Sequence, residues 1–211
     1  MRAKPAEQIR SKAKRDLILQ VSENLLSQKR FSQISVADVA RGAGVSVATV
    51  YQRFNNKHAM GSILMELYFQ RCQQWWAQAA DSPPAKTLYH ALILIAEKSW
   101  DQMQALHHIM RPAYLFSREH PDLVGDEWQA MEQQAQQGFI QFLENFKAEL
   151  PNIDVKKSAA SLCYFYNFMA VGKLLHWQDN EWAILKNKKT FTKELADFAY
   201  GYLKGQGNVN G

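Results

Sequence analysis

The residue types that most clearly point to a chemistry lie in the segment 47–53, VATVYQR. Thr49 and Gln52 carry side chains that can hydrogen-bond to the edges of DNA bases. Val47 and Ala48 are small, so the backbone can approach the bases closely, and their methyl groups can contact the methyl of thymine. On one helix, this segment predicts a surface that reads base pairs in the major groove.

A second short helix and a tight turn must hold that surface in place. Val39 and Ala40 give the first helix an apolar face. Val50 and Phe54 do the same for the helix that contains the reading surface, which leaves Arg53 facing outward. A helix, a turn of about three to four residues and a second helix form a helix-turn-helix unit, whose second helix enters the major groove. An ordinary helical corner is the alternative that spacing alone leaves open.

Polar residues mark where both helices begin. Ser35 followed by Asp38 predicts a variant of the capping box, in which each side chain bonds to the backbone N–H of the other residue. Ser46 precedes the second helix, where its hydroxyl can accept from a backbone N–H that has no partner within the helix. Gly44 lies at the reversal, where a residue without Cβ adopts a positive φ at little cost.

Residues 15–60 resemble the N-terminal domain of the TetR family of bacterial transcriptional regulators. The matching positions are Arg15-Asp16, Ser35-Val36, Val39-Ala40, Ala43-Gly44-Val45-Ser46, Thr49-Val50-Tyr51, Phe54 and Lys57. The resemblance implies that Tyr51 and Lys57 contact DNA phosphates, which fixes register without reading sequence. We expect the DNA-binding residues to be Ser35, Ser46, Val47, Ala48, Thr49, Tyr51, Gln52 and Lys57. Arg30 and Ser22 depart from the family pattern, in which Gly and Ala are usual.

The distribution of charge favours a polyanionic partner at one end of the chain. Residues 1–60 contain 11 Lys and Arg against 4 Asp and Glu, whereas residues 61–211 contain 14 against 16. A basic N-terminal domain followed by a nearly neutral remainder is typical of nucleic-acid-binding proteins. Residues 1–13 carry Arg2, Lys4, Arg10 and Lys12, and they form either a solvated tail or an arm that contacts phosphates.

No pattern in the sequence indicates an enzyme, a metal site or a cofactor. A Ser-His-Asp order, a Gly-rich phosphate loop and metal-ligand spacing are missing. Two cysteines, Cys72 and Cys163, cannot form a disulfide framework. We interpret them as small buried residues in a reducing cytosol, with a redox switch as the alternative. The longest apolar run, 159–172, is shorter than the roughly 20 residues of a membrane span, and no signal peptide is recognisable, so a cytoplasmic protein is expected.

Helical periodicity alone is visible along the whole chain, which predicts an all-α fold of about nine helices. We expect a helix-turn-helix DNA-binding domain at 1–56, a helical effector-binding and dimerisation domain at 57–204, and a flexible tail at 205–211. Outside the helix-turn-helix, helices are expected at 14–28, 57–80, 85–104, 106–118, 122–150, 154–177 and 188–203. Residues of the first helix expected to pack under the helix-turn-helix are Leu17, Ile18, Val21, Leu25 and Leu26. Residues 55–57 are expected to form a turn, 81–84 a break, and Pro112 a bend or restart.

The helix at 154–177 favours a homodimer. Between residues 159 and 172 it is apolar almost all round, so it must be buried on every side, and a body of about five helices favours burial against a second subunit. The last helix offers another apolar stripe. The TetR resemblance implies that the last two helices of each subunit form the dimer interface. Two related recognition helices would then read a palindromic operator.

Aromatic and Met residues crowd the middle of the chain and are either core residues or the lining of a pocket. Trp, Tyr and Met suit planar or irregular apolar ligands, and their polar atoms can orient them. The expected ligand-binding residues are Trp100, Met103, His107, Met110, Tyr114, Trp128, Met131, Tyr166 and Met169. By analogy with the TetR family, the ligand is a small, mostly apolar or aromatic effector that changes the spacing of the two DNA-binding domains through the helix at 57–80 and releases a repressor from its operator. A DNA-binding repressor without an effector is the alternative, and activation is a further one.

Overall fold

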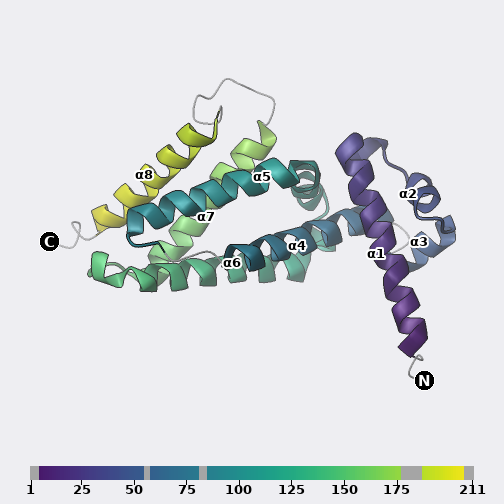
Figure 1. Ribbon diagram of the computed structural model, residues 1–211, viewed down its shortest axis with the longest axis horizontal. Coiled ribbons are helices and arrows are strands. Elements are labelled where there is room, and N and C mark those ends of the chain that lie inside the picture. Colours follow the sequence, from purple (N-terminus) through teal and green to yellow (C-terminus); the bar gives the residue numbers. More distant parts are fainter. Residues whose placement is uncertain (1–4, 55–57, 81–84, 177–186, 207–211) are drawn as a thin grey trace. The chain divides into compact units, whose positions relative to one another are not determined.

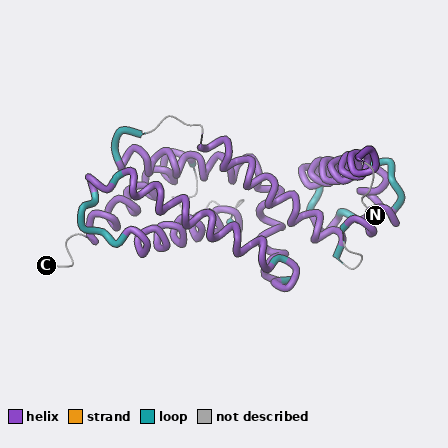
Figure 2. Tube along the Cα trace, turned by 90° about the horizontal axis from the view of Figure 1, so that it is seen from below, coloured by secondary structure: helices purple, strands orange, loops and turns teal. Residues whose placement is uncertain are grey.

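The computed structural model describes residues 5–54, 58–80, 85–176 and 187–206, and in these ranges it contains helices and loops but no strand (Figure 2). The predicted all-α class is confirmed. Eight α-helices follow one another within the described ranges (Figure 1): α1 (Pro5–Gln28), α2 (Val36–Gly42), α3 (Val47–Arg53), α4 (Ala59–Ala80), α5 (Leu88–Glu119), α6 (Gly125–Asn145), α7 (Val155–Leu175) and α8 (Lys188–Gln206). Short 3-10 helices lie at Phe31–Gln33, Pro121–Leu123 and Lys147–Glu149. The expected turn at 55–57 and the break at 81–84 lie outside the described residues.

Two helices that the sequence predicts separately form the single helix α5. Pro112 lies inside it. Proline lacks the N–H that would donate to the carbonyl of residue 108, and in a helix this costs about 3 kcal/mol. Ile109 and Ala113, on either side of the proline, are both 0% exposed. Packing of this buried face therefore outweighs the lost hydrogen bond, and the helix continues through the proline instead of restarting.

The chain divides into two compact units. Unit 1 comprises Met1–Gln73 and His108–Val124, and unit 2 comprises Gln74–His107 and Gly125–Gly211. Helices α4 and α5 each contribute residues to both units. The expected DNA-binding domain at 1–56 lies within unit 1, which also includes the first part of α4 and the last part of α5.

In unit 1, α1 packs on α2 and α2 packs on α3. Helix α1 begins at Pro5 rather than near residue 14, because proline fits the first turn of a helix, where its missing N–H is not needed. Its buried residues include Ile18, Leu19 and Leu26, whereas Leu17, expected in the core, is 41% exposed. Each residue turns a helix by 100°, so an error of one position rotates the apolar face away from its partner.

Ion pairs between α1 and α4 account for the face of α1 that is observed. Arg15 and Glu23 of α1 pair with Glu66 and Arg71 of α4, respectively. Helix α1 therefore packs against α4 as well as against the helix-turn-helix, and its buried face is shared between them. Ser22 is 0% exposed, and its hydroxyl donates to the Ile18 carbonyl at 2.8 Å, so the hydroxyl is satisfied within α1.

In unit 2, α6 packs along α7, and α7 contacts α8. The buried leucines of this unit include Leu88, Leu92, Leu143, Leu162 and Leu195. Tyr164 and Phe168 of α7 are each 65% exposed and Phe198 of α8 is 53% exposed, which is unusual for side chains of this size. Among the described helices, none is long and apolar enough to cross a membrane.

Candidate nucleic-acid interface

The turn between α2 and α3 has the geometry that the sequence predicts. Gly44 has a φ of 61°, in the left-handed region where a Cβ is costly. The Val45 N–H donates to the Ala40 carbonyl at 3.0 Å, and the Gly44 N–H donates to the Arg41 carbonyl at 3.3 Å. This pair of hydrogen bonds is the Schellman motif, which satisfies the carbonyls at the end of α2. The motif ends α2 and fixes the direction in which the chain enters α3.

Both short helices begin with the predicted caps. The Asp38 N–H donates to the Ser35 hydroxyl at 3.2 Å, and the Ser35 N–H donates to an Asp38 carboxylate oxygen at 3.0 Å, which completes the capping box of α2. Hydrogen bonds from the Ser35 hydroxyl and N–H hold the pKa of the Asp38 carboxyl below its usual range. At the start of α3, the Thr49 N–H donates to the Ser46 hydroxyl at 3.1 Å. The prediction of N-caps at Ser35 and Ser46 is confirmed.

One face of α3 is buried and the other is free to meet a partner. Val50 is 0% exposed and Phe54, just beyond the helix, is 3% exposed, so both belong to the core of unit 1. The residues on the opposite side that are exposed are Ser46, Val47, Ala48, Tyr51 and Gln52. Thr49 is half-buried, and its hydroxyl lies 2.8 Å from the hydroxyl of Ser46. Seven of the eight expected DNA-binding residues lie in the described part of unit 1, and Lys57 lies outside the described residues.

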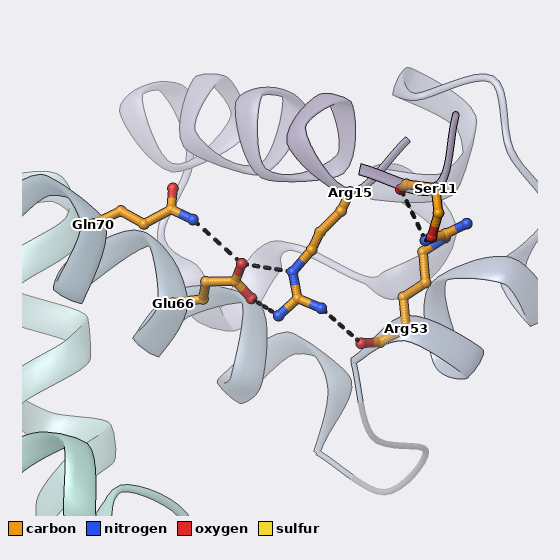
Figure 3. Close-up of polar contacts among 5 residues, drawn as sticks. All are labelled: Ser11, Arg15, Arg53, Glu66 and Gln70. Atoms are coloured by element: carbon orange, nitrogen blue, oxygen red, sulfur yellow. Dashed lines mark hydrogen bonds and ion pairs between the residues drawn. The ribbon is translucent and has the colours of Figure 1, made fainter. Parts of the chain in front are cut away.

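Arg53 differs from its expected position. Instead of facing outward with Gln52, its guanidinium Nη1 donates to the Ser11 carbonyl at 3.0 Å and lies 2.8 Å from the Ser11 hydroxyl (Figure 3). The sequence shows no sign of this contact, because Ser11 lies 42 residues earlier in a segment that we expected to be a tail or an arm. Since α1 is helical from Pro5, Ser11 is held by the helix and provides a fixed acceptor.

Arg15 joins three helices of unit 1. Its Nε donates to Glu66 of α4 at 2.7 Å, and a second hydrogen bond links the same two side chains (Figure 3). Its guanidinium also lies 4.9 Å from the centre of the Phe54 ring. Its Nη1 lies 3.5 Å from the Arg53 carbonyl, at the end of α3. Gln70, one turn further along α4, donates to Glu66 at 3.3 Å and orients the carboxylate.

The departures from the family pattern have local explanations. Arg30 has a φ of −65°, which any residue adopts, so the backbone at this position does not require glycine. Its N–H donates to the Gln33 side chain at 3.3 Å, in the turn that leads to α2. Neither Arg30 nor the buried Ser22 lies on the exposed face of α3.

The nine residues expected to bind a ligand are divided between the two units. Met110 and Tyr114 belong to unit 1, and the other seven belong to unit 2. Met103 and Tyr166 are buried, and burial raises the pKa of the Tyr166 hydroxyl, which lies 3.4 Å from the Leu92 carbonyl. Trp100, half-buried, lies between Phe191, at a ring distance of 5.3 Å, and the Lys173 ammonium, at 4.7 Å. The contacts of these side chains join α5, α7 and α8, as contacts between core residues do.

A pocket is present on a different surface. In unit 1 a cavity of about 560 Å³ is lined by Leu17, Gln20, Val21, Glu23, Asn24, Ser27 and His108, none of which was expected to bind a ligand. Most of these side chains come from α1. The lining of the cavity contains both polar and apolar side chains, and none of them belongs to α3.

In the described parts of the chain, the side chains form neither a metal site nor a reactive thiol. No group of three or more His, Cys, Asp or Glu side chains lies close enough there to hold a metal ion. Neither Cys72 nor Cys163 forms a disulfide. Burial raises the pKa of the Cys72 thiol to about 12 and also raises the pKa of Cys163, which is half-buried. A thiol with a raised pKa is a poor nucleophile at neutral pH.

The segment that contains the helix-turn-helix matches a known protein family. Residues 18–60 match the family described as "Bacterial regulatory proteins, tetR family". The HTH-type transcriptional regulator EthR of Mycolicibacterium smegmatis (strain ATCC 700084 / mc(2)155) is 38% identical over 68 residues, which are 32% of this chain and 31% of that protein. The match therefore spans about a third of the length of this relative.

Two solved structures resemble the fold over nearly the whole chain. The fatty acid degradation regulator FadR from Bacillus halodurans matches with a TM-score of 0.59 and 13% identity, over 97% of this chain and 99% of that chain. The TetR family repressor AlkX from Dietzia sp. strain DQ12-45-1b, implicated in biodegradation of n-alkanes, matches with a TM-score of 0.51 and 15% identity, over 91% of this chain and 96% of that chain. At these identities the likeness concerns the fold.

Proposed function

We propose that this chain, whose residues 18–60 match the TetR family of bacterial regulatory proteins, is a DNA-binding transcriptional regulator that reads its operator with α3. The observation that carries this proposal is the division of α3 into a buried face at Val50 and an exposed face at Val47, Ala48 and Gln52. The Schellman motif and the Ser46 cap hold that exposed face in a fixed orientation, as discrimination between bases requires.

Within this interface the residues have different roles. Gln52 and Thr49 hydrogen-bond to base edges, and Val47 and Ala48 contact thymine methyl groups. Ser35, Ser46, Tyr51 and Lys57 contact the phosphate backbone and so set the register. The Ser46 hydroxyl accepts from the Thr49 N–H at 3.1 Å and shares a 2.8 Å hydrogen bond with the Thr49 hydroxyl. When Thr49 donates in that bond, the proton of Ser46 is available for a phosphate oxygen.

We propose further that the protein acts as a homodimer through α7 and α8. Tyr164, Phe168 and Leu175 recur along α7 at intervals of four and seven residues, and all are exposed. Phe165 joins this stripe to α8, with its ring 5.0 Å from that of the exposed Phe198. A contiguous aromatic surface of this kind is typical of a protein–protein interface. A two-fold axis through it would give the protein two recognition helices and a palindromic operator.

The effector is proposed to be a small, mostly apolar or aromatic molecule that binds among the seven expected residues of unit 2. Trp100, Met103 and Tyr166 offer apolar contacts there, and His107 offers an imidazole whose Nδ1 lies 3.2 Å from the Gln104 carbonyl. Helices α4 and α5 belong partly to each unit, so they provide the covalent path by which binding in unit 2 changes the state of unit 1. The effector shifts operator affinity only as far as it binds one state of the dimer more tightly than the other.

Selection of duplexes from a random pool by the purified protein tests the DNA-binding proposal. We expect recovery of a palindrome with half-sites at least about one helical turn apart. Recovery of no consensus would contradict the proposal, and a consensus with a single half-site would contradict the dimer. An effector screen then measures affinity for that duplex: a compound that weakens binding supports a ligand-released repressor, and no effect across apolar and aromatic compounds supports a repressor without an effector.

A further inference from the structure

Two arginines fasten the C-terminal end of α3 to α1, and each donates to the backbone of the other's helix. Arg53, the last residue of α3, donates to the Ser11 carbonyl of α1 at 3.0 Å and contacts its hydroxyl at 2.8 Å. In the opposite direction, Arg15 of α1 approaches the Arg53 carbonyl at 3.5 Å. Figure 3 shows the Arg15 guanidinium between Glu66 and the Arg53 carbonyl, and the Arg53 guanidinium next to Ser11. The carbonyls at a helix end have no partner within the helix, and here a side chain supplies one.

Arg15 is itself held by α4. Two hydrogen bonds to Glu66, one of them 2.7 Å long, orient its guanidinium, and Gln70 orients Glu66. Such a two-point contact restricts an arginine more than a single ion pair does. The side chain of Glu66 is 19% exposed and that of Arg15 is 44% exposed, so the contact lies at the edge of the packed surface between α1 and α4. The end of α3 is therefore tied to α1 directly and to α4 through Arg15.

The base-facing residues lie at the other end of the same helix. Helix α3 has only seven residues, so a small rotation or shift of its last turn moves Val47 and Ala48 by a similar amount. A hydrogen bond between a side chain and a base edge weakens steeply with such changes in distance and angle. Contacts with phosphates made by long side chains are less sensitive, because those side chains can follow the backbone.

We propose that Arg15 and Arg53 are positioning residues that set how α3 enters the major groove without touching DNA themselves. Their loss lowers discrimination between the operator and other sequences more than it lowers affinity for DNA in general. Glu66 is a positioning residue as well, because it holds the guanidinium of Arg15. This inference rests on the proposed function, since it assigns residues that control specificity at the same interface.

Glu66→Gln separates this proposal from a simple charge effect. Removal of a carboxylate makes unit 1 more positive, so electrostatics alone would raise affinity for every duplex equally. The positioning role instead lowers the ratio of affinities for the selected operator and a random duplex, by about tenfold or more, since one well-placed base contact supplies discrimination of about this size. An unchanged ratio would overturn the proposal.

A double-variant cycle tests Arg53. Ser11→Ala removes the hydroxyl that Arg53 contacts but keeps the backbone carbonyl, so we expect a smaller fall in the operator-to-random ratio than in Arg53→Ala, and little further fall when it is added to Arg53→Ala. The slope of log affinity against log salt for a random duplex should stay constant in both. A slope reduced by about 0.9 in Arg53→Ala would show a phosphate contact and overturn the proposal. Arg111→Ala, an exposed arginine of α5 in unit 1, is the control for charge.

Thermal unfolding of each variant provides the remaining control. A ratio that falls only in the variants that are partly unfolded at the assay temperature would overturn the positioning role, because the fall would then follow the general loss of structure and not the loss of one contact. Glu66→Gln preserves the shape of the side chain, so it tests the proposal even if Arg15→Ala fails to fold. If the wild-type protein selects no duplex, the proposed function fails and this inference fails with it; a normal selection with unchanged ratios in the variants rejects the inference alone.

Discussion

The contacts that orient α3 in unit 1 differ from those that join α6, α7 and α8 in unit 2. Unit 1 uses paired charges and caps: Arg15 with Glu66, Glu23 with Arg71, and the hydroxyl of Ser46 at the start of α3. Unit 2 uses aromatic packing, with Phe139 5.4 Å from Tyr166 and further rings between α7 and α8, and it leaves a large aromatic surface exposed. Directional contacts fix orientation, which a DNA-reading helix needs. Aromatic surfaces give affinity over a broad area, which subunit association needs.

The aromatic surface of unit 2 provides the largest expected effect. Phe168→Asp places a carboxylate in the proposed interface, where it would be desolvated without a partner, so the dimer should dissociate. Loss of bivalent binding should weaken operator affinity by about 10²–10⁴-fold. Light scattering coupled to size-exclusion chromatography measures the mass of the protein in solution and so distinguishes a dimer from a monomer. Leu115→Asp, at a residue of unit 1 that is 39% exposed, is the control and should leave the mass unchanged. A dimer that survives Phe168→Asp would place the interface elsewhere.

The core of unit 1 gives a sharper test, because two adjacent residues of α1 differ in burial. Ile18 is 0% exposed and Leu17 is 41% exposed. Ile18→Ala should lower the free energy of unfolding by about 2–5 kcal/mol, since it leaves a cavity in a packed core. Leu17→Ala should change it by less than about 1 kcal/mol. Urea denaturation measures both. Equal losses would mean that the buried face of α1 lies where the sequence first suggested.

Two helical glycines, one in each unit, differ in how closely other atoms approach the position of a Cβ. A Cβ at Gly61 of α4 would lie 2.0 Å from the Phe116 ring, which itself packs against Phe31 and His120. Gly61→Ala should therefore destabilise unit 1 by about 1–3 kcal/mol. Gly138 of α6 has no atom within 4 Å of such a Cβ, so Gly138→Ala should stabilise the helix by up to about 1 kcal/mol. Thermal unfolding of the two variants should show shifts of opposite sign, and shifts of the same sign would contradict this description.

The smallest effect concerns the thiols, one in each unit. The pKa of Cys72 is about 12, so at pH 8 only about one molecule in ten thousand carries its thiolate. Cys163 is half-buried, with a pKa that burial also raises. Iodoacetamide should therefore label Cys163 slowly and Cys72 hardly at all in native protein, as mass spectrometry of the peptides would show. Labelling in denaturant should reach both, and faster labelling of Cys72 than of Cys163 in native protein would reveal opening of unit 1.

Local features of the helix-turn-helix were predictable because their determinants lie within a few residues of one another. Gly44 takes its positive φ, and Ser35, Asp38 and Ser46 form their caps, through contacts that span five residues or fewer. Nothing beyond the segment is needed to specify them. The buried and exposed faces of α3 follow equally from the position of Val50 within its helical turn.

Features that depend on distant partners could not be predicted from one sequence. Arg15 pairs with Glu66 across 51 residues, and Arg53 turns to Ser11 across 42, so the outward position expected for Arg53 was wrong. The expected separation of residues 85–104 and 106–118 into two helices was wrong for a similar reason, since burial of the residues around Pro112 decides whether the helix continues. The ligand-binding residues stay a prediction, because a core and a pocket use the same aromatic side chains.

The most direct test of the central claim compares wild-type protein and Gln52→Ala on the selected operator and on each of its single-base-pair variants. If α3 reads bases, Gln52→Ala should lose about 1–3 kcal/mol of discrimination at one symmetry-related pair of positions and keep its preferences elsewhere. A loss of the same size at every position, or none at any, would contradict the claim that the exposed face of α3 reads the operator.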